Sequence, residues 1–401
     1  MKRVLFLLAA VFLAWSAPKA NAQLTKEAIA LNAFAEELDY AATAPDFVGL
    51  AVAVVKDGKV ALVRTYGVRE AGRNEKVTPD TVFRIASLSK GFAGTLATME
   101  AAKGKLDLSE KVVKIVPQFK LRSAKDTEAV TLEDVLSHRT GLPPYAYDNL
   151  LEAGISPLEI LSKYSGVKSI CPVGDCFSYQ NTTFNVIAPA IEQATGNSFA
   201  KELQTFILDP LGMTTTSLGK QGLVSTGNWA RPHRRSGMDW IPTAVKDPYY
   251  KVPAAGGVNS SINDLAKWMI AQMGERPDVI PVDALNEAHR KRISTPSENS
   301  RTRSLKLPVK TTYYGLGWRT YDYAGQKLIN HSGSVEGYFA QIAWLPERRS
   351  GIVVLSNTRG SRATKITPTW LDYELGLPKT DWFKMGDIAL AAAPSVTASG
   401  D

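Results

Sequence analysis

The chain has 401 residues, of which 44% are hydrophobic and 21% charged, an ordinary globular composition that allows a large core and two subdomains. Its formal net charge of +8 suits either an anionic substrate or a solvated surface. No basic block is interleaved with aromatic residues, which argues against a nucleic-acid partner. The cysteines and histidines show no structural zinc spacing, so we expect no metal and no cofactor.

Residues 1–22 are typical of a secretory signal peptide, with a basic start, an apolar segment and a small-x-small cleavage site that ends at Ala22. The alternative is a membrane anchor. The apolar segment is too short to cross a bilayer comfortably, and no later segment is long and apolar enough to do so. We therefore predict a periplasmic or secreted protein without a stable membrane span.

The elements that follow form three groups. A helix is predicted over Lys26–Tyr40, and two strands, Val48–Val55 and Val60–Tyr66, are joined by an Asp-Gly turn typical of a hairpin. A mainly helical region covers about residues 105–290, with its clearest helices at Thr131–Ser137 and Phe184–Ala194. Strands return near the C-terminus at Tyr314–Tyr321, Leu328–His331, Gly337–Leu345 and Gly351–Ser356, before a last helix at Trp370–Leu375.

This order predicts an α+β fold. Strands from both chain ends would form one antiparallel sheet flanked by helices, with the large helical subdomain of about residues 105–290 inserted between them. The folded domain would span residues 23–380, and the stretch 381–401 would form a flexible tail. A cleft between the sheet and the helical subdomain is the expected place for a site.

Ser87 and Lys90 stand three residues apart where a β-branched run passes into a helical one. Residues i and i+3 share a helix face, so the Lys90 amine can reach the Ser87 hydroxyl. A desolvated lysine can help to remove the serine proton and create a nucleophile. The same spacing occurs at four other places in the chain, so the hypothesis depends on local context. The alternative is that Ser87 only caps the helix.

Cys171 and Cys176 are separated by four residues. In an oxidising compartment this spacing predicts a disulfide that closes a small loop just before Tyr179.

Tyr179 and Asn181 lie two residues apart at the start of a predicted helix. In extended chain such residues point the same way, so both side chains could enter one cleft. A phenol held near a lysine can have its pKa lowered and act as a proton shuttle. A packed tyrosine followed by a capping asparagine is the alternative.

The run His331-Ser332-Gly333-Ser334 ends one predicted strand and precedes another. Small residues at such an edge would let a substrate backbone approach and pair with the sheet. The N–H of Ser334 could then donate to an oxyanion. The alternative for His331 is a half-buried strand histidine.

Together, and in this order, these residues resemble the motifs Ser-x-x-Lys, Tyr-x-Asn and Lys/His-Thr/Ser-Gly of penicillin-recognising serine hydrolases of the class C β-lactamase and DD-peptidase type. Three supporting phrases are also similar to that family: LSHRTGLP at 136–143, PAAGG at 253–257 and YGLGW at 314–318. The resemblance covers about residues 30–375.

The resemblance implies that Ser87 is the acylated nucleophile, that Lys90 shapes its proton transfer, and that Tyr179 accepts the proton. It also implies substrate-binding roles for Asn181, His331, Ser332, Gly333 and Ser334. Asn181 would bond the amide side chain of the substrate, His331 would help to orient its carboxylate, and the N–H groups of Ser87 and Ser334 would form the oxyanion hole.

The activity implied is hydrolysis of the amide bond of β-lactams. Similar geometry suits a D-Ala-D-Ala carboxypeptidase or endopeptidase, a penicillin-binding protein, or a related esterase or D-aminopeptidase. His331 stands where typical class C β-lactamases carry lysine, which favours the peptidase-type relatives. Two alternatives come from another class of function, namely a penicillin-binding sensor and an inactive homologue that binds cell-wall fragments. We expect a monomer that acts on a small molecule, either a β-lactam or a D-amino-acid peptide.

Overall fold

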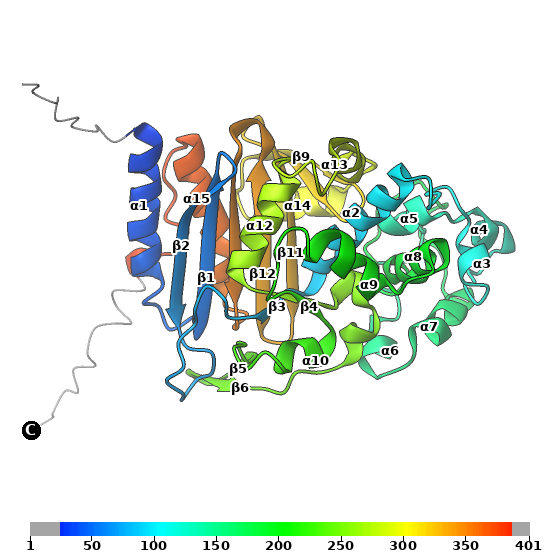
Figure 1. Ribbon diagram of the computed structural model, residues 1–401, viewed down its shortest axis with the longest axis horizontal. Helices are drawn as coiled ribbons and strands as arrows, with labels where there is room; N and C mark the ends of the chain where they lie inside the picture. Colours follow the sequence, from blue (N-terminus) through cyan, green and yellow to red (C-terminus); the bar gives the residue numbers. More distant parts are fainter. Residues whose placement is uncertain (1–24, 387–401) are drawn as a thin grey trace, which may run out of the picture.

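A computed structural model describes residues 25–386 of the chain (Figure 1). The predicted signal peptide, 1–22, and most of the predicted tail lie outside the described residues. Within the described range, no helix has the length and apolar character needed to cross a membrane.

An eight-stranded antiparallel sheet forms the centre of the molecule, with strand order β2-β1-β13-β12-β11-β10-β9-β8. Its strands are β1 (Gly49–Lys56), β2 (Lys59–Gly67), β8 (Ile293–Ser294), β9 (Val309–Tyr314), β10 (Arg319–Tyr323), β11 (Gln326–Val335), β12 (Tyr338–Leu345) and β13 (Ser350–Ser356). The N-terminal hairpin pairs with the last strand, β13, so the prediction of one sheet built from both chain ends is confirmed.

The two faces of this sheet bury alternate residues, as the period of a strand requires. In β1, Leu50 and Val52 pack in the core cluster that includes α1 (Lys26–Ala41) and α15 (Ile366–Leu375), whereas Ala51 and Ala53 pack in the cluster that includes α2 (Ser89–Ala102) and α12 (Ile262–Gln272). Figure 1 shows α1 and α15 on one side of the sheet and α12 on the other. Helices therefore cover both faces.

The segment between β2 and β8 supplies a mainly helical part, which lies beside the sheet in Figure 1. Its helices after α2 are α3 (Val112–Ile115), α4 (Ala124–Ala129), α5 (Leu132–Leu136), α6 (Asp148–Glu152), α7 (Pro157–Lys163), α8 (Ile187–Thr195), α9 (Phe199–Leu203), α10 (Gly219–Val224), α11 (Pro253–Gly256), α12 and α13 (Val282–His289), and α14 (Pro296–Ser304) follows β8. Short strands accompany them: β3 (Phe83–Arg84), β4 (Ser217–Leu218) and β7 (Val258–Ser260) in one small sheet, and β5 (His233–Ser236) with β6 (Asp239–Pro242) in another.

The structure differs from the prediction at Tyr314–Tyr321, which is not one strand. β9 ends at Tyr314, and β10 begins at Arg319. The turn between them packs on α2, where Gly317 has a φ of +81° and where an added Cβ would lie 2.2 Å from the carbonyl oxygen of Lys90. The break in the strand thus brings the turn directly against the helix that carries the predicted nucleophile.

The chain also remains packed beyond the predicted domain end at residue 380. Phe383 is buried against the cluster around α1 and α15, and the indole N–H of Trp382 donates to Asp372 at 2.7 Å. Residues 381–386 therefore contact the folded domain.

Candidate active site

A cavity of about 840 Å³ lies between the sheet and the helical part. Its lining includes Ser87, Tyr179, Asn181, Ser332, Gly333 and Ser334 from the predicted site, together with Tyr145, Asp148, Glu152, Tyr249, Arg301, Arg319, Glu336 and Arg359. Lys90 is fully buried and contacts Ser87 from within the protein. His331 is buried and is not among the residues that line the cavity.

Ser87 sits in a 3₁₀ turn, Ala86–Leu88, that leads from β3 into α2. Ala86 has a φ of +49°, which is unusual for a residue with a side chain. The turn is tied down by Ser89, whose hydroxyl donates to the Ala86 carbonyl at 2.6 Å and accepts from the Val258 N–H at 3.0 Å. The alternative prediction that Ser87 caps the helix is wrong, since the cap position of α2 is Leu88.

Lys90 has three polar neighbours around its amine. The Nζ atom lies 2.7 Å from Asn181 Oδ1, 2.9 Å from the Ala255 carbonyl oxygen and 3.3 Å from Ser87 Oγ. Burial lowers the pKa of Lys90 to about 7, although Asp148 opposes the shift. A neutral amine has two hydrogens and one lone pair. The amide and carbonyl oxygens can only accept, so the lone pair is left for the hydroxyl of Ser87.

Asn181 connects this lysine to a carboxylate that the sequence analysis missed. Its Nδ2 donates to Asp148 Oδ2 at 2.7 Å while its Oδ1 accepts from Lys90. Asp148 begins α6, 33 residues before Asn181 in sequence. No local pattern marked it, because its role depends on the packing of α6 against the Tyr-x-Asn segment.

Tyr179 lines the cavity beside Ser87, but its electrostatics differ from the expectation. Burial raises the pKa of the phenol well above its usual value, and the opposing effects of Arg319 and of a hydrogen bond with Ser87 are smaller. The expectation that the neighbouring lysine lowers this pKa is therefore wrong. At neutral pH the phenol carries its proton, so Tyr179 is suited to donate a proton rather than to start as a base.

His331 belongs to a closed chain of hydrogen bonds behind Tyr179. The Gln180 N–H donates to His138 Nδ1 at 3.2 Å, so the proton of His138 is on Nε2, which lies 3.2 Å from the Tyr314 oxygen. The Tyr314 hydroxyl donates to His331 Nε2 at 3.1 Å, and His331 Nδ1 donates to the Ser332 carbonyl at 2.9 Å. Burial lowers the pKa of both imidazoles well below the usual value. Both rings are thus neutral with every nitrogen in use.

Ser332, Gly333 and Ser334 form the edge of β11 at the cavity, beyond the last residue of β11 that pairs with β10, Asn330. An added Cβ on Gly333 would lie 2.2 Å from the Ile85 carbonyl oxygen and 2.8 Å from the Ser87 nitrogen. Glycine is therefore required because the strand packs on the turn that holds Ser87, the predicted nucleophile. This close contact is made with the protein's own backbone, whereas the sequence suggested a substrate backbone.

Arg319 is a second side chain that the sequence analysis missed. It begins β10 directly after the YGLGW phrase, lines the cavity, and has its guanidinium carbon 5.5 Å from the centre of the Tyr179 ring. Glu298 lies 3.2 Å away and offsets part of its charge. Arg301 and Arg359 also line the cavity. The positive charge at the cavity is thus supplied by arginines, whereas His331 is buried behind it.

The family model described as Beta-lactamase matches residues 34–374 of the chain. The chain belongs to the Beta-lactamase family.

Two curated proteins and a solved structure are similar to this chain. The chain is 26% identical over 359 residues to the unguisins hydrolase ungD of Aspergillus violaceofuscus, a match that covers 83% of this chain and 63% of that protein. It is 26% identical over 320 residues to protein flp of Staphylococcus aureus, a match that covers 79% of this chain and 61% of that protein. The octameric penicillin-binding protein homologue from Pyrococcus abyssi has a TM-score of 0.75 and 25% identity, covering 86% of this chain and 77% of that one.

The chain spans less than two thirds of the length of these two curated relatives. The family and the structural neighbour nevertheless support a serine hydrolase of the β-lactamase and transpeptidase type, on the α+β fold that the sequence predicted.

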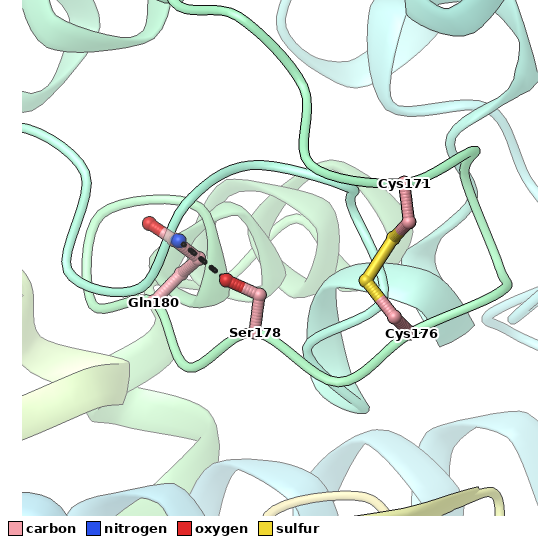
Figure 2. The surroundings of a disulfide bond; sticks show 4 residues. All are labelled: Cys171, Cys176, Ser178 and Gln180. Atoms are coloured by element: carbon pink, nitrogen blue, oxygen red, sulfur yellow. Dashed lines mark hydrogen bonds between the residues drawn. A yellow bond between two sulfur atoms is a disulfide. The ribbon is translucent and has the colours of Figure 1, made fainter. Parts of the chain in front are cut away.

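In this Beta-lactamase-family chain, the cysteine pair braces the Tyr-x-Asn segment. Cys171 and Cys176 form a disulfide with an S–S distance of 2.00 Å, shown beside Ser178 and Gln180 in Figure 2. Backbone hydrogen bonds tie the loop to residues 138–141 through Ile170, Gly174 and Ser178. The predicted brace before Tyr179 is confirmed.

A smaller cavity of about 260 Å³ adjoins the site of this family member. It shares Arg319, Ser332 and Phe339 with the larger cavity and continues past Leu328 to Leu371 of α15. Ser87 is not among its lining residues, so the chemistry belongs to the larger cavity.

Proposed function

We propose that the protein is a secreted or periplasmic serine hydrolase that forms an acyl-enzyme through Ser87 and hydrolyses the amide bond of β-lactams. The observation that carries this proposal is the position of the Lys90 amine, which has two fixed acceptors and Ser87 Oγ at 3.3 Å. Because burial lowers the pKa of Lys90 to about 7, a substantial share of the amine is neutral at physiological pH.

The reaction begins when neutral Lys90 takes the hydroxyl proton of Ser87. The serine oxygen forms a bond to the amide carbonyl carbon, and the carbonyl oxygen becomes an oxyanion. The N–H groups of Ser87 and Ser334 are assigned to stabilise this oxyanion, which the packing of Gly333 against the Ser87 turn supports. The bond from carbon to nitrogen then breaks.

Tyr179 is assigned to deliver the proton to the leaving nitrogen. Its phenol keeps its proton at neutral pH, and Lys90, now protonated, lies with Nζ 4.8 Å from the centre of its ring. Protonated Lys90 then returns a proton to Tyr179 and is neutral again. In the second half of the reaction a water oxygen attacks the acyl carbon while Lys90 takes a proton from the water, the ester bond to Ser87 breaks, and Lys90 passes that proton to the serine oxygen.

The substrate carboxylate is assigned to the arginine side of the cavity. A guanidinium pairs with a carboxylate through two parallel N–H bonds, which neutral His331 cannot do. Arg319 is the best placed of the three arginines because it faces the Tyr179 ring.

A D-Ala-D-Ala peptidase or penicillin-binding protein is the second candidate. The neutral, buried His331 favours it, because typical class C β-lactamases carry a lysine at that motif position. The two candidates share every step up to the acyl-enzyme and differ in how fast water removes the acyl group.

Mass spectrometry of the mature protein, mixed rapidly with a penicillin or a chromogenic cephalosporin, tests the proposal. An adduct on Ser87 that forms and decays with product release is expected for β-lactam hydrolysis. A persistent adduct would support the penicillin-binding alternative or a sensor.

Ser87→Ala should abolish the adduct. Ser165→Ala should not, although Ser165 also precedes a lysine, Lys168, by three residues. If no adduct forms with either β-lactam, the β-lactam proposal is wrong. An esterase or D-aminopeptidase with the same nucleophile would then be tested with ester and D-amino-acid anilide substrates. A role that survives Ser87→Ala would point to an inactive, binding homologue.

A further inference from the structure

Two acidic side chains stand on the helical side of the cavity. Asp148 and Glu152 are four residues apart on α6, and both line the cavity. The hydroxyl of Tyr249 lies 2.9 Å from Glu152 Oε1 and 3.5 Å from Asp148 Oδ2, which brings the two carboxylates to one corner. The acids and the arginines thus come from different parts of the fold, since the arginines belong to α14, β10 and the segment after β13.

One oxygen of Asp148 has no partner within the described residues. Oδ2 accepts from Asn181, but Oδ1 is buried without a hydrogen bond, and the residue is only 8% exposed. An unpaired buried carboxylate oxygen carries a substantial desolvation cost. Burial accordingly raises the pKa of Asp148. A cation from the ligand would offset this cost.

Within residues 25–386, no lysine or arginine forms an ion pair with Asp148 or Glu152, although the charge of nearby Lys90 lowers the pKa of Asp148. Lys90 directs its amine to Asn181, Ala255 and Ser87, and reaches Asp148 only through the Asn181 amide. Lys251 donates instead to the Gly154 carbonyl oxygen at 2.6 Å. The acidic corner lies next to Asn181, whose amide donates to Asp148 at 2.7 Å.

We propose that the substrate carries a primary ammonium group on the part that lies beside Asn181, and that Asp148 and Glu152 recognise it. This inference rests on the proposed acyl-enzyme function and narrows its substrate class to molecules with an ammonium on the acyl side of the cleaved bond. Tyr249 is a positioning residue that holds the Glu152 carboxylate toward the corner.

Two penicillins that differ by one amino group test the inference. Ampicillin carries an ammonium on its acyl side chain, and benzylpenicillin lacks it. The rate constant for Ser87 acylation is measured by mass spectrometry for both. We expect ampicillin to acylate about tenfold more efficiently, the size expected of one charge-assisted hydrogen bond. Binding of both compounds to Ser87→Ala, measured by calorimetry, gives the same comparison without turnover.

The ampicillin preference is the ratio of the acylation rate constants of the two penicillins. Glu152→Gln should reduce this ratio about threefold, because Glu152 is exposed. Asp148→Asn should bring the ratio close to one. Any disturbance of Lys90 in Asp148→Asn affects both penicillins equally and cancels in the ratio. Glu336→Gln is the matched control. It removes one acid from the sheet side of the same cavity, where Glu336 pairs with Lys246 at 3.0 Å, and should leave the ratio unchanged.

Equal acylation and equal binding of the two penicillins would overturn the inference while leaving the proposed function intact. A preference that survives both Asp148→Asn and Glu152→Gln would overturn the assignment of these residues, as would the absence of measurable ampicillin binding to Ser87→Ala. A failure of the proposed function differs from these results, because the wild-type protein would then form no Ser87 adduct with either compound.

Discussion

Two buried chains of hydrogen bonds flank Tyr179, and they differ in whether they end at the cavity. The first runs from Ser87 through Lys90 and Asn181 to Asp148. The second runs from His138 through Tyr314 to His331. Burial lowers the pKa of the basic groups in both chains.

The first chain is open, since it ends at a serine that lines the cavity and at a carboxylate with one oxygen that has no partner in the part of the chain that the structure describes. The second is closed, because each ring nitrogen already has a partner. A perturbed pKa alone therefore does not identify a catalytic group. A free lone pair or proton must also face the substrate.

The largest expected effect is in the open chain. Lys90→Met should slow acylation of Ser87 about 10³-fold, because it removes the base that accepts the serine proton. Mass spectrometry with a penicillin measures the rate. Lys168→Met, which changes a lysine at the same spacing from Ser165, should leave the rate unaltered. Acylation of Lys90→Met within tenfold of the wild type would mean that another group is the base.

The pH dependence of acylation sharpens the assignment. Lys90 must be neutral to act, and its pKa of about 7 means that the rate rises with pH and levels off above 7. At pH 5, two units below that pKa, acylation should be about 100-fold slower than on the plateau. If Tyr179 were the base, the rise would occur only above pH 10, because burial raises the phenol pKa. Stopped-flow measurement of the acylation rate from pH 5 to above pH 10 distinguishes Lys90 from Tyr179 as the base.

The closed chain should respond to mutation in stability more than in rate. Tyr314→Phe leaves two buried imidazole nitrogens without partners, so we expect the free energy of unfolding to fall by about 1–3 kcal/mol. Acylation should fall less than tenfold. Urea denaturation measures the free energy of unfolding. Tyr313→Phe, at the neighbouring position of β9, is the control. A loss of acylation as large as that of Lys90→Met would show that the closed chain takes part in the chemistry.

The smallest effect on rate is expected at the disulfide. Replacing both Cys171 and Cys176 with serine should lower stability by about 2 kcal/mol, the value for a loop of this size in the chain-entropy model. Acylation should stay within about twofold at temperatures where the protein remains folded. A much larger loss without unfolding would mean that the loop controls the position of Tyr179.

The sequence predicted those features that depend on neighbours along the chain. The N-terminal hairpin follows from the Asp57-Gly58 turn between two β-branched runs, and the structure places β1 and β2 within a residue of the expected bounds. Tyr179 and Asn181 enter one cavity because residues two apart in extended chain share a side.

Spacing alone could not decide which Ser-x-x-Lys pair matters. Ser198 also precedes a lysine by three residues, and its hydroxyl merely caps α9 by accepting the Lys201 N–H at 3.2 Å. Ser87 differs because its lysine, Lys90 of α2, is buried against Asn181 and Ala255, which come from distant parts of the chain. Only that burial brings the pKa of a lysine close to neutrality.

The sequence by itself thus determined the fold class and the order of the motifs, because hydrophobic period and the order of elements along the chain encode them. The tertiary structure alone decided that Arg319, rather than His331, faces the cavity, that Tyr179 retains its proton, and that Asp148 completes the lysine chain. The reason is that charge, exposure and pKa depend on desolvation and on contacts between residues far apart in sequence, and no local pattern records them.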